Sequence, residues 1–158
     1  MEKRILNVFD FDGTLMDSPL PEMGKKMYED KYGKPWPHKG WWGQLDSLEC
    51  FEVTPIWKVM AIYNRLVKVD GSLNVLMTNR LSKFESVVRK KLNGYYEFDI
   101  YNFKSDGRDK PERIEEILLS YPNIREINIF DDMDEQIKKF KEFRKKNTEY
   151  NIRITQII

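Results

Sequence analysis

The chain has one cysteine, one histidine and no long apolar run in its 158 residues. The single Cys50 excludes an internal disulfide, and such cysteine use suits a reducing compartment. No apolar run approaches the roughly 20 residues that a bilayer-spanning helix needs. Charged and polar residues follow Met1 immediately, so no secretory signal is predicted. We therefore expect a cytoplasmic protein with no membrane partner.

An excess of charge of either sign is also missing. The formal net charge is +1, so any preference for nucleic acid has to come from local patches rather than from a global field. Charged residues nevertheless make up 34% of the chain and apolar residues 41%, which describes a heavily charged surface. The length suffices for one buried core. We predict a single domain over residues 1–158 and leave its oligomeric state open.

Short apolar runs alternate with amphipathic stretches along most of the chain. We expect strands at residues 5–9, 73–77, 98–103, 127–130 and 152–157, the last of them at an edge of the sheet. We expect helices at residues 54–67, 82–92, 111–120 and 133–146. This alternation predicts a three-layer α/β/α, Rossmann-like fold with a mostly parallel sheet.

Residues 16–53 differ from the rest of the chain. They hold four prolines, four glycines and three of the four tryptophans, which favours loops with one short helix at residues 22–31. We interpret this segment as a loop-rich insertion after the first strand.

Polar residues gather where the predicted strands end. They are Asp10, Asp12, Thr78, Lys110 (which opens the helix before the fourth strand), Asp131 and Asp132. In a parallel sheet the carboxyl ends of the strands meet in one crevice, where ligands bind. Two aspartates one residue apart do not suit a packing role, because unpaired buried carboxylates are costly. They suit a hard cation and a phosphoryl group.

The run Asp10-Phe11-Asp12-Gly13-Thr14 resembles the first motif of the haloacid dehalogenase (HAD) superfamily of aspartate-dependent phosphotransferases. Thr78, Lys110 and the pair Asp131-Asp132 resemble the second, third and fourth motifs, in the same order. Lys104 is the alternative third-motif lysine, but Lys110 fits better because it starts the helix that leads to the acidic pair. A receiver-like phosphoacceptor domain uses similar residues in a different order.

The HAD resemblance implies a Mg²⁺-dependent phosphatase that works through an aspartyl-phosphate intermediate. It implies that Asp10 is the nucleophile and that Asp12 is the general acid and base. The implied magnesium ligands are Asp10, Asp12 (through its backbone carbonyl), Asp131 and Asp132. It further implies a phosphate-binding group of Thr78, Asn79, Arg80 and Lys110. For Arg80 the alternative is a surface charge at a helix start.

A narrower resemblance lies in the insertion and near the end of the chain. Pro19-Leu20-Pro21, Trp36, Gly40-Trp41-Trp42 and the segment from Tyr121 to Asp132 are similar to the HAD family of Swiss Army Knife RNA-repair proteins. This similarity implies that the phosphorylated substrate is an RNA or DNA end, or a nucleotide. Two departures are visible: Met133 follows the acidic pair where an Arg is usual, and Asn79 stands where Gly is frequent.

Lysines and aromatic residues are interleaved in the insertion, as in proteins that grip single-stranded nucleic acid. The simpler interpretation, which we favour for Trp41 and Trp42, is a small satellite core; Trp36 stays open. The alternative functions are a nucleic-acid-binding or adaptor module that retains the HAD fold, and a small-metabolite phosphatase or a phosphotransferase.

Overall fold

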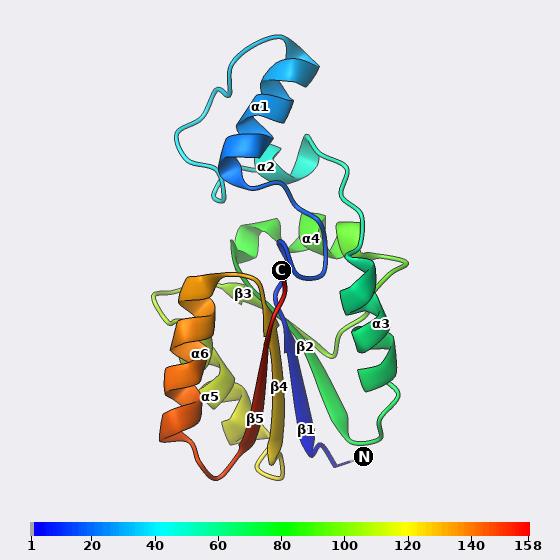
Figure 1. Cartoon of the computed structure of the whole chain (residues 1–158), viewed down its shortest axis with the longest axis vertical. Coiled ribbons are helices and arrows are strands. Elements are labelled where there is room, and N and C mark those ends of the chain that lie inside the picture. Colours follow the sequence, from blue (N-terminus) through cyan, green and yellow to red (C-terminus); the bar gives the residue numbers. More distant parts are fainter. Residues whose placement is uncertain (1) are drawn as a thin grey trace.

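The computed structural model describes residues 2–158, and these residues build a five-stranded sheet (Figure 1). The strands are β1 (Ile5–Phe9), β2 (Ser72–Leu81), β3 (Ile100–Lys104), β4 (Glu126–Asp131) and β5 (Asn151–Gln156). Their order is β3-β2-β1-β4-β5, and each neighbouring pair is parallel. The predicted α/β fold with a C-terminal edge strand is confirmed, and all carboxyl ends lie at the same end of the sheet.

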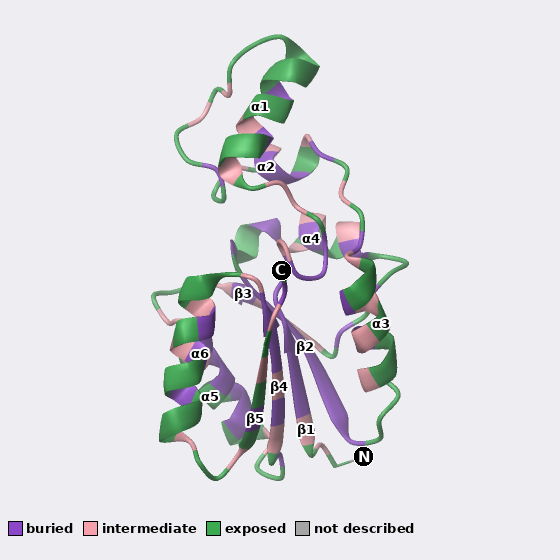
Figure 2. Ribbon diagram, in the orientation of Figure 1, coloured by how far each residue is buried: buried purple, intermediate pink, exposed green. Residues whose placement is uncertain are grey.

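Two pairs of helices cover the two faces of the sheet. They are α3 (Trp57–Leu66) with α4 (Glu85–Leu92), and α5 (Lys110–Ser120) with α6 (Asp134–Lys146). Successive side chains of a strand point to opposite faces, so Leu6 and Val8 join the core under α5 and α6, whereas Phe9 joins the core under α3 and α4. Figure 2 shows the result: the central strands are largely buried, whereas the edge strand β5 and the outer sides of the helices are largely exposed. None of the helices within residues 2–158 is long and apolar enough to cross a membrane.

Three asparagines lie side by side at the same level of the central strands. Asn7 of β1 is in register with Asn74 of β2 and with Asn128 of β4. The Asn7 amide donates to Asn74 Oδ1 at 2.9 Å, and the Asn128 amide donates to Asn7 Oδ1 at 2.9 Å. Because buried amides are costly without partners, this ladder favours the observed strand register.

The second predicted strand was too short. It was expected to stop at Thr78, but β2 continues to Leu81, with a register irregularity against β3 between Met77 and Leu81. The polar residues stay in the strand because tertiary partners satisfy their side chains, as described below for Arg80. After β2 a 3₁₀ turn, Ser82–Phe84, precedes α4, so the predicted helix over 82–92 begins in a tighter form.

The helix predicted from Thr54 begins only at Trp57. Pro55 instead forms a β-bridge with Met16, and the Ile56 backbone N–H donates to the Leu15 carbonyl at 2.9 Å. This pairing with the loop after β1 overrides the local helix signal of Thr54-Pro55.

The segment 16–53 lies beyond the carboxyl ends of the strands (Figure 1). It contains α1 (Pro21–Tyr32) and the short α2 (Asp46–Glu49). Tyr28, Trp41 and Phe51 are buried together, with Trp36 packed against them. The satellite-core prediction is therefore confirmed for Trp41. The chain accordingly carries only a small, loop-rich cap over the strand ends.

Candidate active site

The turn after β1 is tight and brings its residues close to the end of β4. The Phe11 carbonyl accepts hydrogen bonds from the Leu15 and Met16 backbones at 3.1 and 3.2 Å. Gly13 has φ +72°, and a Cβ at this position would lie 2.3 Å from Asp132 Oδ2. The sequence therefore needs glycine here for its left-handed conformation and for the close approach of Asp132.

Lys110 is delivered to the site by the first turn of α5. Asp109 and Glu112 form a capping box at the start of this helix, which fixes where it begins. The Lys110 side chain is buried, and its ammonium donates to Asp10 Oδ1 at 2.8 Å and to Asp131 Oδ2 at 2.6 Å. One cation thus bridges carboxylates from two neighbouring strands.

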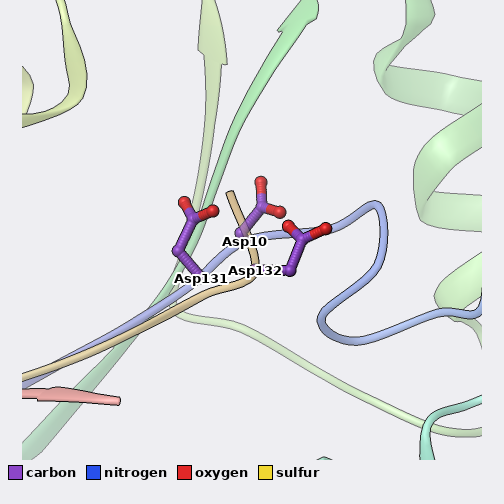
Figure 3. A group of neighbouring side chains, drawn as sticks. All are labelled: Asp10, Asp131 and Asp132. Carbon is purple, nitrogen blue, oxygen red and sulfur yellow. The ribbon is translucent and has the colours of Figure 1, made fainter. Parts of the chain in front are cut away.

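Asp10, Asp131 and Asp132 form a compact carboxylate cluster (Figure 3). Oxygen atoms from all three lie within 4.8 Å of one another. Burial raises the pKa of Asp10 well above its ordinary value and raises that of Asp132 as well. Burial alone would lower the pKa of Lys110, but the charges of Asp10 and Asp131 outweigh it and the net shift is upward. The ammonium therefore stays protonated.

The cluster has the charge and the atoms that a divalent cation needs. Three carboxylates face one ammonium, which leaves two negative charges uncompensated when all are ionised. Asp132 Oδ1 is buried and has no hydrogen-bond partner among the described residues. Mg²⁺ prefers such oxygen ligands. Asp10, Asp131 and Asp132 therefore fit a magnesium site.

Asp12 is paired with a buried arginine. Arg80 Nε donates to Asp12 Oδ2 at 2.8 Å and Arg80 Nη2 to Asp12 Oδ1 at 3.0 Å, the bidentate geometry of a strong ion pair. Arg80 Nη1 also donates to the Trp42 carbonyl at 2.9 Å and to Ser47 Oγ at 2.6 Å. Arg80, predicted to bind phosphate, thus links Asp12 to the insertion.

Arg113, which the sequence argument missed, supports the end of β2. It donates to the Thr78 carbonyl at 2.7 Å and to Asn79 Oδ1 at 2.8 Å. Burial lowers its pKa to about 10. The sequence contains a pattern that could have identified Arg113: it stands three residues after Lys110 and therefore on the same face of the helix. Thr78 itself is buried and accepts a hydrogen bond from the Arg80 backbone at 3.0 Å.

A cavity of about 300 Å³ brings the predicted site residues together. It is lined by Asp10, Asp12, Thr78, Asn79, Arg80, Lys110, Asp131 and Asp132. Lys104, the alternative lysine, is absent from its lining. The lining residues that the sequence argument missed are Gly13, Ser18, Leu20, Met133 and Gln136. Trp42 also lines the cavity and is 37% exposed, so its assignment to the satellite core was wrong.

Comparison with known proteins shows the family of this chain. The sequence model of the family described as HAD domain family 1 in Swiss Army Knife RNA repair proteins matches residues 34–158. The chain belongs to this family. The uncharacterized protein YMR265C of Saccharomyces cerevisiae is 23% identical to this chain in an alignment 169 residues long. The alignment covers 87% of this chain and 36% of the yeast protein. The chain therefore spans about a third of the length of the curated relative that it matches.

Solved structures share the HAD fold with this family member at low sequence identity. The HAD domain of the Legionella pneumophila effector Lem4 has a TM-score of 0.58 at 12% identity, covering 98% of this chain and 85% of that one. A chain of the Pnkp1/Rnl/Hen1 complex has a TM-score of 0.57 at 12% identity, covering 99% and 46%. A Thermotoga maritima protein described as a putative beta-phosphoglucomutase has a TM-score of 0.54 at 20% identity, covering 90% and 82%.

Proposed function

We propose that this protein is a Mg²⁺-dependent phosphatase that works through an aspartyl-phosphate on Asp10 and acts on nucleic-acid ends or nucleotides. The observation that carries the proposal is the buried Asp10 carboxylate, held by Lys110 beside Asp131 and Asp132 in an open cavity. Family membership supports phosphatase-type chemistry. The proposal covers residues 1–158 as one domain with the insertion 16–53, and a cytoplasmic location.

In the first half-reaction, an Asp10 oxygen forms a bond to phosphorus while the bond from phosphorus to the leaving oxygen breaks. Asp12 first takes a proton from solvent, for which one of its hydrogen bonds with Arg80 has to open, and then gives this proton to the leaving oxygen. Water then attacks the phosphorus of the aspartyl-phosphate and passes a proton to Asp12. Asp10 is released with inorganic phosphate, so the net reaction is hydrolysis of one phosphomonoester.

The surrounding residues offset charge during both steps. Mg²⁺, held by Asp10, Asp131, Asp132 and the Asp12 backbone carbonyl, would supply positive charge toward the phosphate oxygens. Lys110 lowers the repulsion between the Asp10 carboxylate and the phosphate. The Thr78 oxygen already accepts from the Arg80 backbone, so its hydroxyl hydrogen is available to a phosphate oxygen, beside Asn79 and Arg80.

Two observations support a nucleic-acid end or a nucleotide as the substrate. The family is described from RNA repair proteins, and a chain of the Pnkp1/Rnl/Hen1 complex shares the fold. The insertion is small, and its Trp42 lines the cavity. A small cap leaves room for a bulky leaving group.

The proposal is tested by phosphate release from aryl phosphate, sugar phosphates, nucleotides and 5′- or 3′-phosphorylated RNA and DNA oligomers. We expect release that needs Mg²⁺ and that falls by at least about a thousandfold in Asp10→Asn, because the amide is not a nucleophile. Asp70→Asn, which changes an exposed aspartate outside the cavity, is the matched control. Mg²⁺ should also raise the unfolding temperature of the wild-type protein.

The other outcomes separate the alternatives. Oligomer binding without release from any substrate would replace the phosphatase with a nucleic-acid-binding module. Phosphate transfer to an added alcohol or nucleoside would identify a phosphotransferase. Faster turnover of small sugar phosphates than of nucleotides and oligomers would identify a metabolite phosphatase.

A further inference from the structure

Two adjacent tryptophans of the insertion have opposite environments. Trp41 is 3% exposed and packs against Tyr28 and Phe51. Trp42 is 37% exposed and lines the cavity that contains Asp10 and Lys110. Trp41 therefore belongs to the small core of the insertion, and Trp42 does not.

The position of Trp42 is fixed relative to the reacting groups. The Arg80 guanidinium lies over the Trp42 ring, with its central carbon 4.9 Å from the ring centroid. The same guanidinium holds the Trp42 carbonyl at 2.9 Å and Asp12 at 2.8 and 3.0 Å. A ring that is held in place loses little conformational freedom when a ligand packs on it. Trp42 is thus preorganised beside the site of phosphate chemistry.

Further lining residues supply apolar contacts and unused polar atoms. Leu20 and Met133 are 57% and 46% exposed and line the same cavity. Within the described residues, four buried side-chain polar atoms have no hydrogen-bond partner, and three of them belong to this lining: Asp132 Oδ1 of the acidic cluster, Ser18 Oγ and Gln136 Oε1. An apolar surface with a few unsatisfied polar atoms suits a flat group that has polar edges.

We propose that Trp42, Leu20 and Met133 form a subsite for a planar heterocyclic base, so that the substrate class is a phosphorylated nucleoside, free or at a strand end. This inference rests on the proposed phosphatase function. A cavity of about 300 Å³ is at the lower end of the range for ligand sites, ~300–1,000 Å³. It fits one nucleotide, and the rest of a strand would lie outside. Ser18 and Gln136 belong to the same lining, and a rotation of these side chains would bring their polar atoms to the polar edge of the base.

The test compares catalytic efficiency, kcat/KM, for nucleoside 3′- and 5′-monophosphates with that for ribose 5-phosphate, which lacks a base. We expect the wild-type protein to favour the nucleotides. Trp42→Ala should lower the ratio of the two efficiencies by about 5- to 150-fold, the loss that corresponds to removing one stacked base. Trp42→Phe keeps an aromatic ring and should keep most of the preference.

Trp57→Ala is the matched control, because Trp57 is 64% exposed on α3 and outside the cavity lining. It should leave the ratio at the wild-type value. A second arm uses oligomers that carry a phosphorylated terminal nucleotide or a phosphorylated abasic terminus. If Trp42→Ala loses the preference for the terminal nucleotide over the abasic terminus, strand ends bind in this subsite. If Trp42→Ala loses only the preference for mononucleotides over ribose 5-phosphate, the subsite is restricted to free nucleotides.

Binding to the Asp10→Asn variant separates the subsite from the reaction. Calorimetry should show a nucleoside monophosphate binding more tightly than ribose 5-phosphate, and this difference should disappear when Trp42→Ala is added. That result supports the subsite even if no phosphate is ever released. Metal-dependent turnover with equal efficiency for both substrates, or a ratio unchanged in Trp42→Ala, would overturn the subsite and leave the phosphatase standing.

Discussion

At the scale of single residues, the acidic site depends on a glycine that leaves room for Asp132 and on a lysine that offsets the carboxylate charges. The absence of a side chain at Gly13 lets the loop after β1 approach Asp132. Lys110 is shared by Asp10 and Asp131, so its ammonium offsets the repulsion within the cluster. Loss of the Lys110 charge would be strongly destabilising, because it would leave the buried carboxylates without a compensating charge.

Gly13→Ala is expected to abolish phosphate release and Mg²⁺-dependent stabilisation. The added methyl would lie 2.3 Å from Asp132 Oδ2, and the φ of +72° costs an L-residue roughly 1–2 kcal/mol. Phosphate release and the unfolding temperature with and without Mg²⁺ are the measurements. Gly107→Ala is the control, because no atom lies within 4 Å of its added Cβ. Wild-type activity in Gly13→Ala would show that the close approach is unnecessary.

At the scale of elements, the insertion is held by its own small core and by one buried arginine. Arg80 of β2 bonds to Ser47 in α2 and to the Trp42 carbonyl, and it ion-pairs with Asp12. Within the insertion, α1 packs on Trp41 at Gly24, where a Cβ would lie 2.1 Å from the indole ring. The geometry of the cap is therefore linked to that of Asp12.

Gly24→Ala is expected to loosen the insertion while the sheet stays folded. Overpacking of this kind costs about 1–3 kcal/mol, which exceeds the helix propensity of about 1 kcal/mol gained from alanine. Limited proteolysis should cut within residues 16–53 faster than in the wild-type protein. Gly43→Ala, where the added Cβ meets no atom within 4 Å, should behave as wild type. Equal cleavage rates in the two variants would contradict the packing of α1 on Trp41.

At the scale of the whole molecule, two buried tyrosines join segments far apart in the sequence. The Tyr96 hydroxyl donates to the Leu15 carbonyl at 3.0 Å, next to the loop that carries Asp12. The Tyr63 hydroxyl of α3 donates to the Glu97 carbonyl at 2.5 Å. Burial raises the pKa of both phenols above the ordinary value of 10.0. Both hydroxyls therefore have to stay protonated in the folded protein.

The free energy of unfolding is expected to fall as the pH rises above about 10. A group whose pKa is raised by folding contributes stability that is complete below its unfolded pKa and is lost as the pH rises through its folded pKa. Urea unfolding between pH 8 and about 11 measures this loss. In Tyr96→Phe the alkaline fall in the free energy of unfolding should be less steep, by up to about 1.4 kcal/mol per pH unit. At neutral pH the same variant should be about 1 kcal/mol less stable, because the hydrogen bond of the hydroxyl is lost.

Tyr95→Phe is the control for this comparison, because Tyr95 is 44% exposed. It should keep the wild-type slope. A Tyr96→Phe variant with an unchanged alkaline slope would show that the buried phenol does not govern stability in this range.

Local patterns in the sequence predict much of the fold, and they predict which residues come together in the candidate site. The strands and helices follow from hydrophobic periodicity, and their alternation implies a parallel sheet. Because parallel strands end at one edge, the polar residues after them, Asp10, Thr78 and Asp131, had to come together. They do line one cavity with Lys110. Membership of the HAD family was already visible in Asp10-Phe11-Asp12-Gly13-Thr14.

Only the tertiary structure decided how the side chains pair. Three features have no local signal in the chain. They are the extension of β2 through Arg80, the start of α3 at Trp57, and the difference in burial between Trp41 and Trp42. Each depends on a partner many residues away: Asp12 lies 68 positions before Arg80. Periodicity reports which face of an element is buried, whereas ion pairs and stacking depend on distances between elements, which only the packed molecule sets.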